Sequence, residues 1–186
     1  MDPTALLNDP SYTVPPVPDA VRGVAWLRSH VVRFSEGDDH RRRRALVEAQ
    51  LDRIDLSVLQ QPGDHVATLA ASLGLPRSVG DDVRTVAACY QPDKRTTTSA
   101  DVALARLVDA AGGSWDEATA GLICILVQGC EATAALIAGS RPPVTSTVRV
   151  APDGTTVTVP LDAIPFGAGR HACPARAHAE ALARRR

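Results

Sequence analysis

The sequence predicts a mainly α-helical protein with one domain and a small β-hairpin near its end. Apolar residues recur at three- and four-residue spacings through most of the chain, as they do along one face of an α-helix. Runs of β-branched residues, typical of strands, are confined to a region after residue 144. The chain has 186 residues, 45% of them hydrophobic, which suffices for one sizeable core. We therefore expect a single domain over residues 1–186.

The first 20 residues contain five prolines and predict an extended N-terminal segment. After this segment, helices are predicted where apolar residues have helical spacing and where glycine, proline or capping residues mark the ends. The predicted helices cover residues 20–34, 38–54, 63–74, 78–90 and 99–111.

A longer central helix is predicted from Ser114, a good N-cap, to residue 139. Residues 121–139 carry a single charge, Glu131, over 19 positions and approach the length of a membrane span. However, Gln128 and Glu131 near the middle would be costly in lipid. We expect this helix to be buried in the core, with no membrane segment in the protein.

The end of the chain has a different pattern. Residues 145–150 and 155–159 are β-branched runs joined through Pro152-Asp153-Gly154, which predicts a β-hairpin. A glycine-rich loop over 166–172 follows, and Pro174, at a first helical position, predicts a final Ala-rich helix.

Composition and charge favour a cytoplasmic protein that does not bind nucleic acid. The chain opens without a basic, then apolar, signal peptide, and its four cysteines lack CxxC spacing. The net charge is −1, so no strong field attracts nucleic acid, and the run Arg41–Arg44 is expected to be a solvated face. Aromatic residues make up only 3% of the chain, so another group is expected to help fill the core.

The stretch that carries most chemical information is P-F-G-A-G-R-H-A-C-P-A, residues 165–175. It is a glycine-rich loop that brings Cys173 to a predicted helix start, where the macrodipole and free amides stabilise a thiolate. Gly167 and Gly169 allow backbone conformations that bring N–H groups close to the sulfur. Such hydrogen bonds tune an iron–thiolate bond, so the loop meets the requirements of a thiolate iron ligand.

This stretch resembles the haem-binding loop of the cytochrome P450 family, F-G-x-G-x-H-x-C-x-G, with Ala175 in place of the last glycine. The resemblance implies haem b as cofactor, Cys173 as the metal ligand and His171 as a partner of a haem propionate. The loop residues that it implies at the cofactor are Phe166, Gly167, Gly169, His171 and Cys173.

Two more segments extend the resemblance to the propionate side. Residues 34–47 resemble the family's C helix, in which a His and an Arg four residues later hold one propionate; His40 and Arg44 have this spacing and share a helical face. The segment after Pro142-Pro143 resembles the strand whose arginine binds the other propionate, which implies Arg149.

The central helix resembles the family's distal helix. Residues 128–133 follow its pattern A/G-G-x-D/E-T-T, which implies that Gly129 admits a ligand to the backbone and that Glu131 is a catalytic acid. Ala132 replaces the alcohol that delivers protons in the family. Thr133, the next candidate, points about 100° away around the helix. The replacement speaks against ordinary dioxygen activation.

Parts of the family's fold are missing. The chain has about half the family's usual length, and no helix with the Glu-x-x-Arg pair lies between the central helix and Pro142; Ala138 precedes Arg141 by three residues. We therefore expect a reduced P450-like scaffold: a long central helix, a small β-hairpin and a Cys haem loop.

The resulting hypothesis is a haem-thiolate oxidoreductase that acts on a small molecule. Peroxide-driven or non-monooxygenase haem chemistry fits best, because neither needs the missing alcohol. The alternative is a non-catalytic, degenerate P450-like protein that acts as an interaction partner of a full-length oxidase or as a homodimer, through a face that the missing helices leave apolar.

Other interpretations of the cysteines stay open. Cys173 is also compatible with a plain buried thiol. A zinc site from His171, Cys173, Cys124 and Cys130 has suitable residue types, but its spacing fits no common zinc pattern. Cys130 is a further candidate for a second iron-side ligand, although core packing explains it as well.

Overall fold

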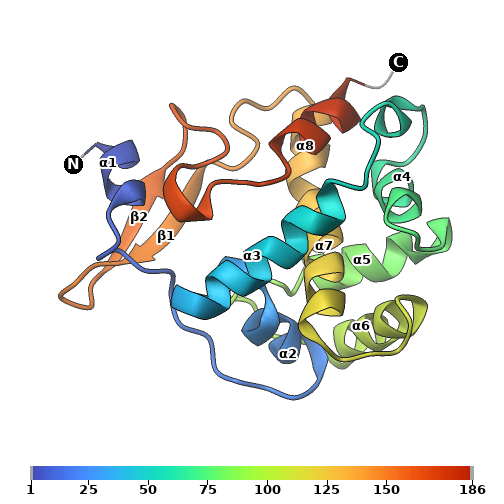
Figure 1. Ribbon diagram of the computed structural model, residues 1–186, viewed down its shortest axis with the longest axis horizontal. Helices are drawn as coiled ribbons and strands as arrows, with labels where there is room; N and C mark the ends of the chain where they lie inside the picture. The colour runs from blue at the N-terminus through green and yellow to red at the C-terminus, as the bar shows by residue number, and fades with distance from the viewer. Residues whose placement is uncertain (1, 185–186) are drawn as a thin grey trace.

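The computed structural model describes residues 2–184; Met1, Arg185 and Arg186, at the ends of the predicted domain, lie outside the described residues. The fold is mainly helical with one two-stranded antiparallel sheet, as the sequence predicts (Figure 1). The helices are α1 (Pro3–Asn8), α2 (Gly23–His30), α3 (Gly37–Leu51), α4 (His65–Ser72), α5 (Gly80–Ala87), α6 (Thr98–Ala110), α7 (Glu117–Ile137) and α8 (Arg176–Ala183). The strands are β1 (Ser146–Val150) and β2 (Thr156–Pro160), and short 3-10 turns form η1 (Val32–Phe34), η2 (Val58–Gln60), η3 (Arg77–Val79) and η4 (Gly169–His171).

The N-terminal segment is not wholly extended, and this prediction is wrong for residues 3–8. Asp2 caps α1, with its side chain accepting a hydrogen bond from the Ala5 N–H at 3.1 Å. Pro3 is the first helical residue, a position where its missing N–H costs nothing. Leu6 and Leu7 are buried, so the helix forms because it packs.

The predicted helix over 20–34 is shorter than expected and ends in a separate turn. It begins at Gly23, whose φ of +68° suits glycine, and the Val24 N–H donates to Asp101 Oδ1 at 2.8 Å. The chain then leaves the helix at Val31, with extended backbone, and forms η1. This break matters because it sets Arg33 and Glu36 outside any helix.

The residues predicted to start two helices, α7 and α8, are wrong. The N-cap of α7 is Asp116, which accepts a hydrogen bond from the Thr119 N–H at 2.8 Å, and not Ser114. Helix α8 begins at Arg176 and not at Pro174. Cys173 therefore lies three residues ahead of the last helix.

Helix α7 is the centre of the main core. It packs against α2, α3, α4, α5, α6 and α8. Among the described residues it is the one helix long and apolar enough to cross a membrane by length and composition, but 56% of that window is buried inside the molecule. This is the arrangement of a core helix, as the sequence predicts.

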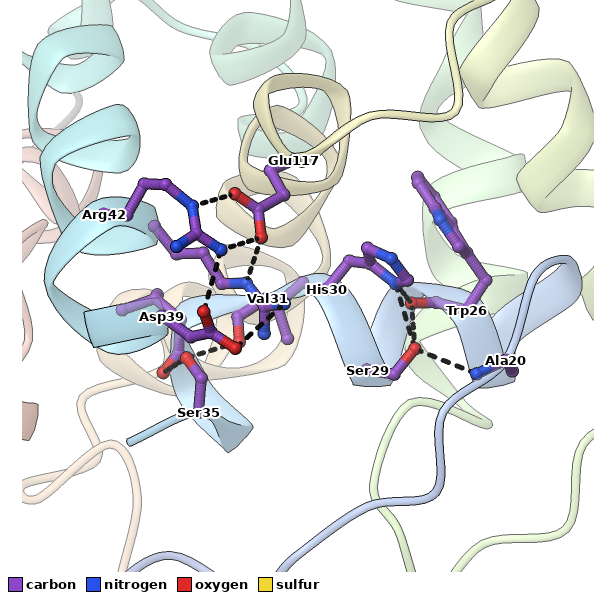
Figure 2. Close-up of polar contacts among 11 residues, drawn as sticks. Ala20, Trp26, Ser29, His30, Val31, Ser35, Asp39, Arg42 and Glu117 are labelled. Carbon is purple, nitrogen blue, oxygen red and sulfur yellow. Dashed lines mark hydrogen bonds and ion pairs between the residues drawn. The ribbon is translucent and has the colours of Figure 1, made fainter. Parts of the chain in front are cut away.

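A set of ion pairs fixes α3 against the start of α7. The Glu117 carboxylate accepts from Arg42 Nε at 2.7 Å and from Arg43 Nε at 2.8 Å, and Arg42 Nη2 also reaches Asp39 at 2.9 Å (Figure 2). The hydrogen bond from Arg42 is the largest factor that lowers the pKa of Glu117, to about 2. Two arginines of the run that we expected to be solvated are thus partners of a carboxylate.

The structure has a second, smaller apolar cluster. Leu6 and Leu7 of α1 pack with Val159 and Leu161 from the hairpin region. In Figure 1, α1 and the hairpin lie at one side of the molecule and the helical core at the other. The chain between Pro165 and Pro174 passes from the first to the second, so the cysteine loop lies where the two parts meet.

Leu126→Ala tests the importance of α7. The side chain is fully buried, so the change should lower the free energy of unfolding by about 2–5 kcal/mol through lost burial and a cavity. Urea denaturation measures this. Ile137→Ala, on the same helix but 44% exposed, is the matched control and should cost well under half as much. Equal losses would contradict the placement of α7.

Candidate functional site

The cysteine loop is shaped by two glycines with left-handed backbone. Gly167 has φ +72° and Gly169 has φ +67°. A side chain at Gly169 would collide with the Leu7 carbonyl oxygen of α1. The Cys173 N–H donates to the Phe166 oxygen at 2.8 Å and closes the loop. The glycines in the predicted motif are thus required by the turn and by contact with α1.

Cys173 is exposed to solvent as a residue, and several groups around it act on its thiol. Burial raises the pKa of Cys173 above its ordinary value, although the Ala175 backbone N–H and the charges of Arg44 and Arg33 act in the opposite direction. Cys173 is therefore an exposed residue whose thiol has a backbone donor, with Arg44 bound to the neighbouring Ala172 carbonyl oxygen.

Helix α3 brings both of its predicted residues to this loop. His40 is buried, and its ring contacts that of His171 edge-on, with 4.3 Å between centroids. Arg44, one turn later, donates from Nη1 to the Ala172 carbonyl oxygen at 2.6 Å and from Nε to Glu48 at 2.6 Å. Thus the shared helical face of His40 and Arg44 does contact the cysteine loop.

Glu36 joins the loop to the N-terminal segment and to the start of α3. Its carboxylate accepts from Arg170 Nε at 2.8 Å, His171 Nε2 at 3.2 Å and the Val14 N–H at 2.8 Å. Burial alone would raise the pKa of Glu36, but these donors, Arg170 first, lower it to about 2. Burial lowers the pKa of His171 to about 4 despite the neighbouring Glu36. At neutral pH the pair is thus a carboxylate and a neutral imidazole.

Arg149 on β1 is a buried cation with no carboxylate partner. It is 6% exposed, and its Nη1 donates to Thr147 Oγ1 at 3.1 Å and to the Val148 carbonyl oxygen at 2.8 Å. Within residues 2–184 it forms no ion pair. Its pKa is lowered, first by burial and then by the like charge of Arg33. The group is costly as it stands, because a buried charge needs an opposite one.

Arg33, on η1, is a second cation that has no carboxylate partner among the described residues. Its Nη1 donates to Gln128 Oε1 on α7 at 3.4 Å, and its Nε is buried with no hydrogen-bond partner in the described part of the chain. His40 Nε2 is a further buried atom without a partner there. We call the guanidiniums of Arg33 and Arg149, together with the imidazole of His40, the cation cluster; burial lowers the pKa of His40, so that its ring is neutral at pH 7. Its unmet donors suit an anion, above all a carboxylate.

The three residues predicted on α7 do not meet this cluster. Gly129 faces α4, and the position of a Cβ there lies 3.1 Å from Leu69 Cδ2, so the expected opening for a ligand is filled. Glu131 is exposed, and Thr133 is buried, near the same side as Gly129. Neither makes a hydrogen bond or ion pair with the cluster among the residues described. Gln128 is the α7 residue that reaches it.

Phe166, Cys124 and Cys130 form no hydrogen bond with the cluster among the residues described, although Cys124 binds Gln128. Phe166 packs under the Arg176 guanidinium, 5.1 Å from its ring centroid, beside a shallow outer hollow of about 340 Å³. Cys124 and Cys130 are buried on α7. Across residues 2–184, no group of three or more His, Cys, Asp or Glu side chains is placed to hold a metal ion, so the four residues of the zinc alternative are not gathered.

Sequence reasoning missed three residues of the site: Arg33, Glu36 and Gln128. Arg33 falls inside an apolar stretch that predicts helix, and Glu36 falls in a predicted turn. Their partners are 95 residues away for Arg33 and more than 130 for Glu36. The one local signal is a charged residue, Arg33, between Val32 and Phe34.

Comparison with solved structures identifies a similar fold. A chain in the crystal structure of P450BioI in complex with hexadec-9Z-enoic acid ligated acyl carrier protein superposes with a TM-score of 0.64. The match covers 97% of this chain and 80% of that chain at 15% sequence identity. At this identity the likeness shows the fold alone. No protein-family model and no curated protein matches the chain.

The Glu36–His171 pair predicts marked sensitivity to acid. The folded pKa of His171 is about 4 and its ordinary value is 6.5, so stability falls as pH drops from about 6.5 to 4, where only the unfolded chain takes up the proton. The pKa of Glu36 is about 2 in the folded protein, against an ordinary value of 4.5. Protonation of Glu36 therefore lowers the free energy of unfolding further between pH 4.5 and 2, by about 3 kcal/mol at most. Urea unfolding at several pH values measures both.

Glu36→Gln isolates the carboxylate. The variant should be less stable than the wild type at pH 7 and should lose less stability between pH 4.5 and 2. Asp162→Asn, at an exposed position, is the control and should keep the wild-type profile. An unchanged acid slope in Glu36→Gln would show that Glu36 is not the titrating group.

Proposed function

We propose that the chain is a P450-like haem-thiolate protein with Cys173 as the iron ligand. The observation that carries the proposal is the position of Cys173, an exposed residue, on a loop whose His171 contacts His40 of the cation cluster, in which buried polar atoms of Arg33 and His40 have no partner in the described chain. Haem b has the matching parts: an iron for the thiolate and two carboxylates for the cations. The loop motif over residues 166–173 and the similar fold support it.

Two of the four predicted propionate residues have unmet capacity. Arg149 is buried with hydrogen-bond partners but no ion-pair partner, and His40 Nε2 has no partner in the described chain. Arg44 and His171 instead have protein partners, the Ala172 carbonyl and the Glu36 carboxylate. We therefore assign His40 and Arg149 as the principal propionate ligands. Arg44 and His171 position the loop against α3.

The proposed activity is oxidation or rearrangement of a small molecule in the cytoplasm. Haem with a thiolate ligand supplies electron donation that favours O–O cleavage. Ala132 and the exposed Glu131 leave no proton relay on α7, so peroxide-driven or non-monooxygenase chemistry fits better than activation of dioxygen. Within this proposal, Gln128 is the polar α7 side chain that faces the cation cluster.

Reconstitution with haemin tests the proposal directly. The reduced wild type with carbon monoxide should give the red-shifted Soret band of a thiolate-ligated complex, and Cys173→Ala should lose that band. Cys89→Ala is the control: it removes a buried thiol outside the cysteine loop, and the variant should keep the thiolate Soret band. The absence of the thiolate band in the wild type would refute the proposal and would favour the non-catalytic alternative.

Arg149→Gln tests the propionate assignment. Removal of a buried, charge-assisted contact should weaken haem binding about tenfold or more. Arg141→Gln is the matched control, since Arg141 binds only backbone carbonyls of Leu136 and Ser140 and should leave affinity unchanged. Haem dissociation to an acceptor protein measures the affinities. Equal affinities in both variants would rule out Arg149 as a propionate ligand.

A further inference from the structure

The C-terminal end of α7 has an exposed face made mostly of small and apolar residues. Ala134 and Ala138 are exposed there, and Ile137 is 44% exposed. Glu131 is exposed as well, and it shares this side of the helix because positions 131, 134 and 138 have three- and four-residue spacing. We call Glu131, Ala134, Ile137 and Ala138 the α7 end face.

The same side of α7 is covered by the rest of the protein earlier in the helix. Val127 lies about three turns before Ala138, and Cys130 about two turns before Ile137, so each pair points in nearly the same direction. Val127 is 3% exposed and Cys130 is 6% exposed. The helix thus continues for about two turns beyond the elements that cover this side. A contiguous apolar surface left open in this way marks a site of interaction.

Two charged residues without an ion-pair partner border the α7 end face. Glu131, at its start, forms no hydrogen bond or ion pair among the described residues. Arg141 lies at the other end, where its Nη1 donates to the carbonyl oxygens of Leu136 at 3.1 Å and Ser140 at 2.8 Å. Both partners are neutral, and within residues 2–184 no carboxylate pairs with Arg141. The face therefore has a negative charge at one end and a positive charge at the other.

A second copy of the chain is the occupant that this order of charges fits. A two-fold axis brings the same face of both copies together and sets their helices antiparallel. With the axis beside Ala134, Glu131 of one copy faces Ile137 of the other, because both lie three residues, about 4.5 Å along the helix, from Ala134. The Arg141 guanidinium lies at that end of the helix. Each Glu131 carboxylate is then beside an Arg141 guanidinium, and no like charges face each other.

The side-chain sizes and the net charge also suit a pair of copies. Ala134 at the axis is small, so the two helices can approach closely, and Ile137 of each copy brings apolar area to bury. The net charge of the chain is −1, so long-range repulsion between copies is weak. A face of two helical turns is smaller than the roughly 800 Å² per partner of a standard interface. The association should therefore be weak and depend on protein concentration.

We propose that the α7 end face pairs with the same face of a second copy, with the two helices antiparallel and Glu131 of each copy beside Arg141 of the other. The dimer does not rest on the haem-thiolate function, because neither residue holds the cofactor in that proposal.

Sedimentation velocity over an about hundredfold range of protein concentration tests the proposal. The wild type should shift from monomer toward dimer as concentration rises, and less so in high salt, which screens exposed ion pairs. Glu131→Arg and Arg141→Glu should each weaken association about tenfold or more, because like charges then face each other at both ends. An equimolar mixture of these two variants should dimerise again, because one copy then supplies two arginines and the other two glutamates.

Disulfide trapping locates the two-fold axis. Ala134→Cys is made in a Cys173→Ala background, in which the three remaining native cysteines are buried. A cysteine at the axis meets its own copy, so mild oxidation with diamide should give a covalent dimer. Val102→Cys in the same background, at a 48% exposed position on α6, is the matched control and should stay monomeric.

Three results would overturn the inference. They are a wild type that stays monomeric throughout the concentration range, a dimer that both charge reversals leave unchanged, and equal cross-linking of the two cysteine variants. Neither experiment uses haem. A failure here therefore leaves the proposed function untouched, and a dimer in a protein that takes up no haem would support this inference alone.

Discussion

The Glu36 carboxylate is the interaction on which the arrangement of the site depends. It accepts hydrogen bonds from the N-terminal segment at Val14 and from the cysteine loop at Arg170 and His171. Arg170 in turn donates to the Tyr12 carbonyl oxygen at 2.8 Å, so the same link holds the N-terminal segment on the loop. Because the helical core and the hairpin cluster are separate apolar units, polar links of this kind decide how the loop lies between them.

Glu36 forms an ion pair with Arg170, but other positive charges near it have no ion-pair partner among the described residues. Arg149 is 6% exposed, and its pKa falls through burial and through the like charge of Arg33. Removal of charges from water costs several kcal/mol per ion unless an opposite charge compensates. The guanidiniums of Arg149 and Arg33 repel each other. The protein as a whole has a net charge of −1, so this repulsion is a local feature that the overall charge does not explain. An anion bound beside both groups would offset these costs.

The parts of the fold and of the site that depend on residues close together in the sequence could be predicted. The hairpin and most helices follow from apolar spacing and from turn residues within a few positions, and the contact of His40 and Arg44 with the loop follows from their four-residue spacing. The break at Val31 and the contact between Arg33 and Gln128 depend on partners 95 residues apart, which periodicity does not record. The exposed position of Glu131 likewise depends on how α7 is rotated in the core. The resemblance of residues 128–133 to the family's pattern does not determine this rotation.

Five of the six aromatic side chains lie within the two cores, and the sixth, Phe166, lies on the cysteine loop against Arg176. Trp26 packs with Trp115, at 4.6 Å between centroids, and Phe34 with Tyr90, at 5.4 Å, in the helical core, while Tyr12 packs in the hairpin cluster. Where the cores meet, the rings of His40 and His171 contact each other edge-on, and Phe166 packs against the Arg176 guanidinium. Burial of apolar area therefore contributes little there, and charge dominates. A ligand that brings both carboxylates and a flat apolar body would add the missing area and the missing charge together, so its binding and the stability of this junction are thermodynamically linked.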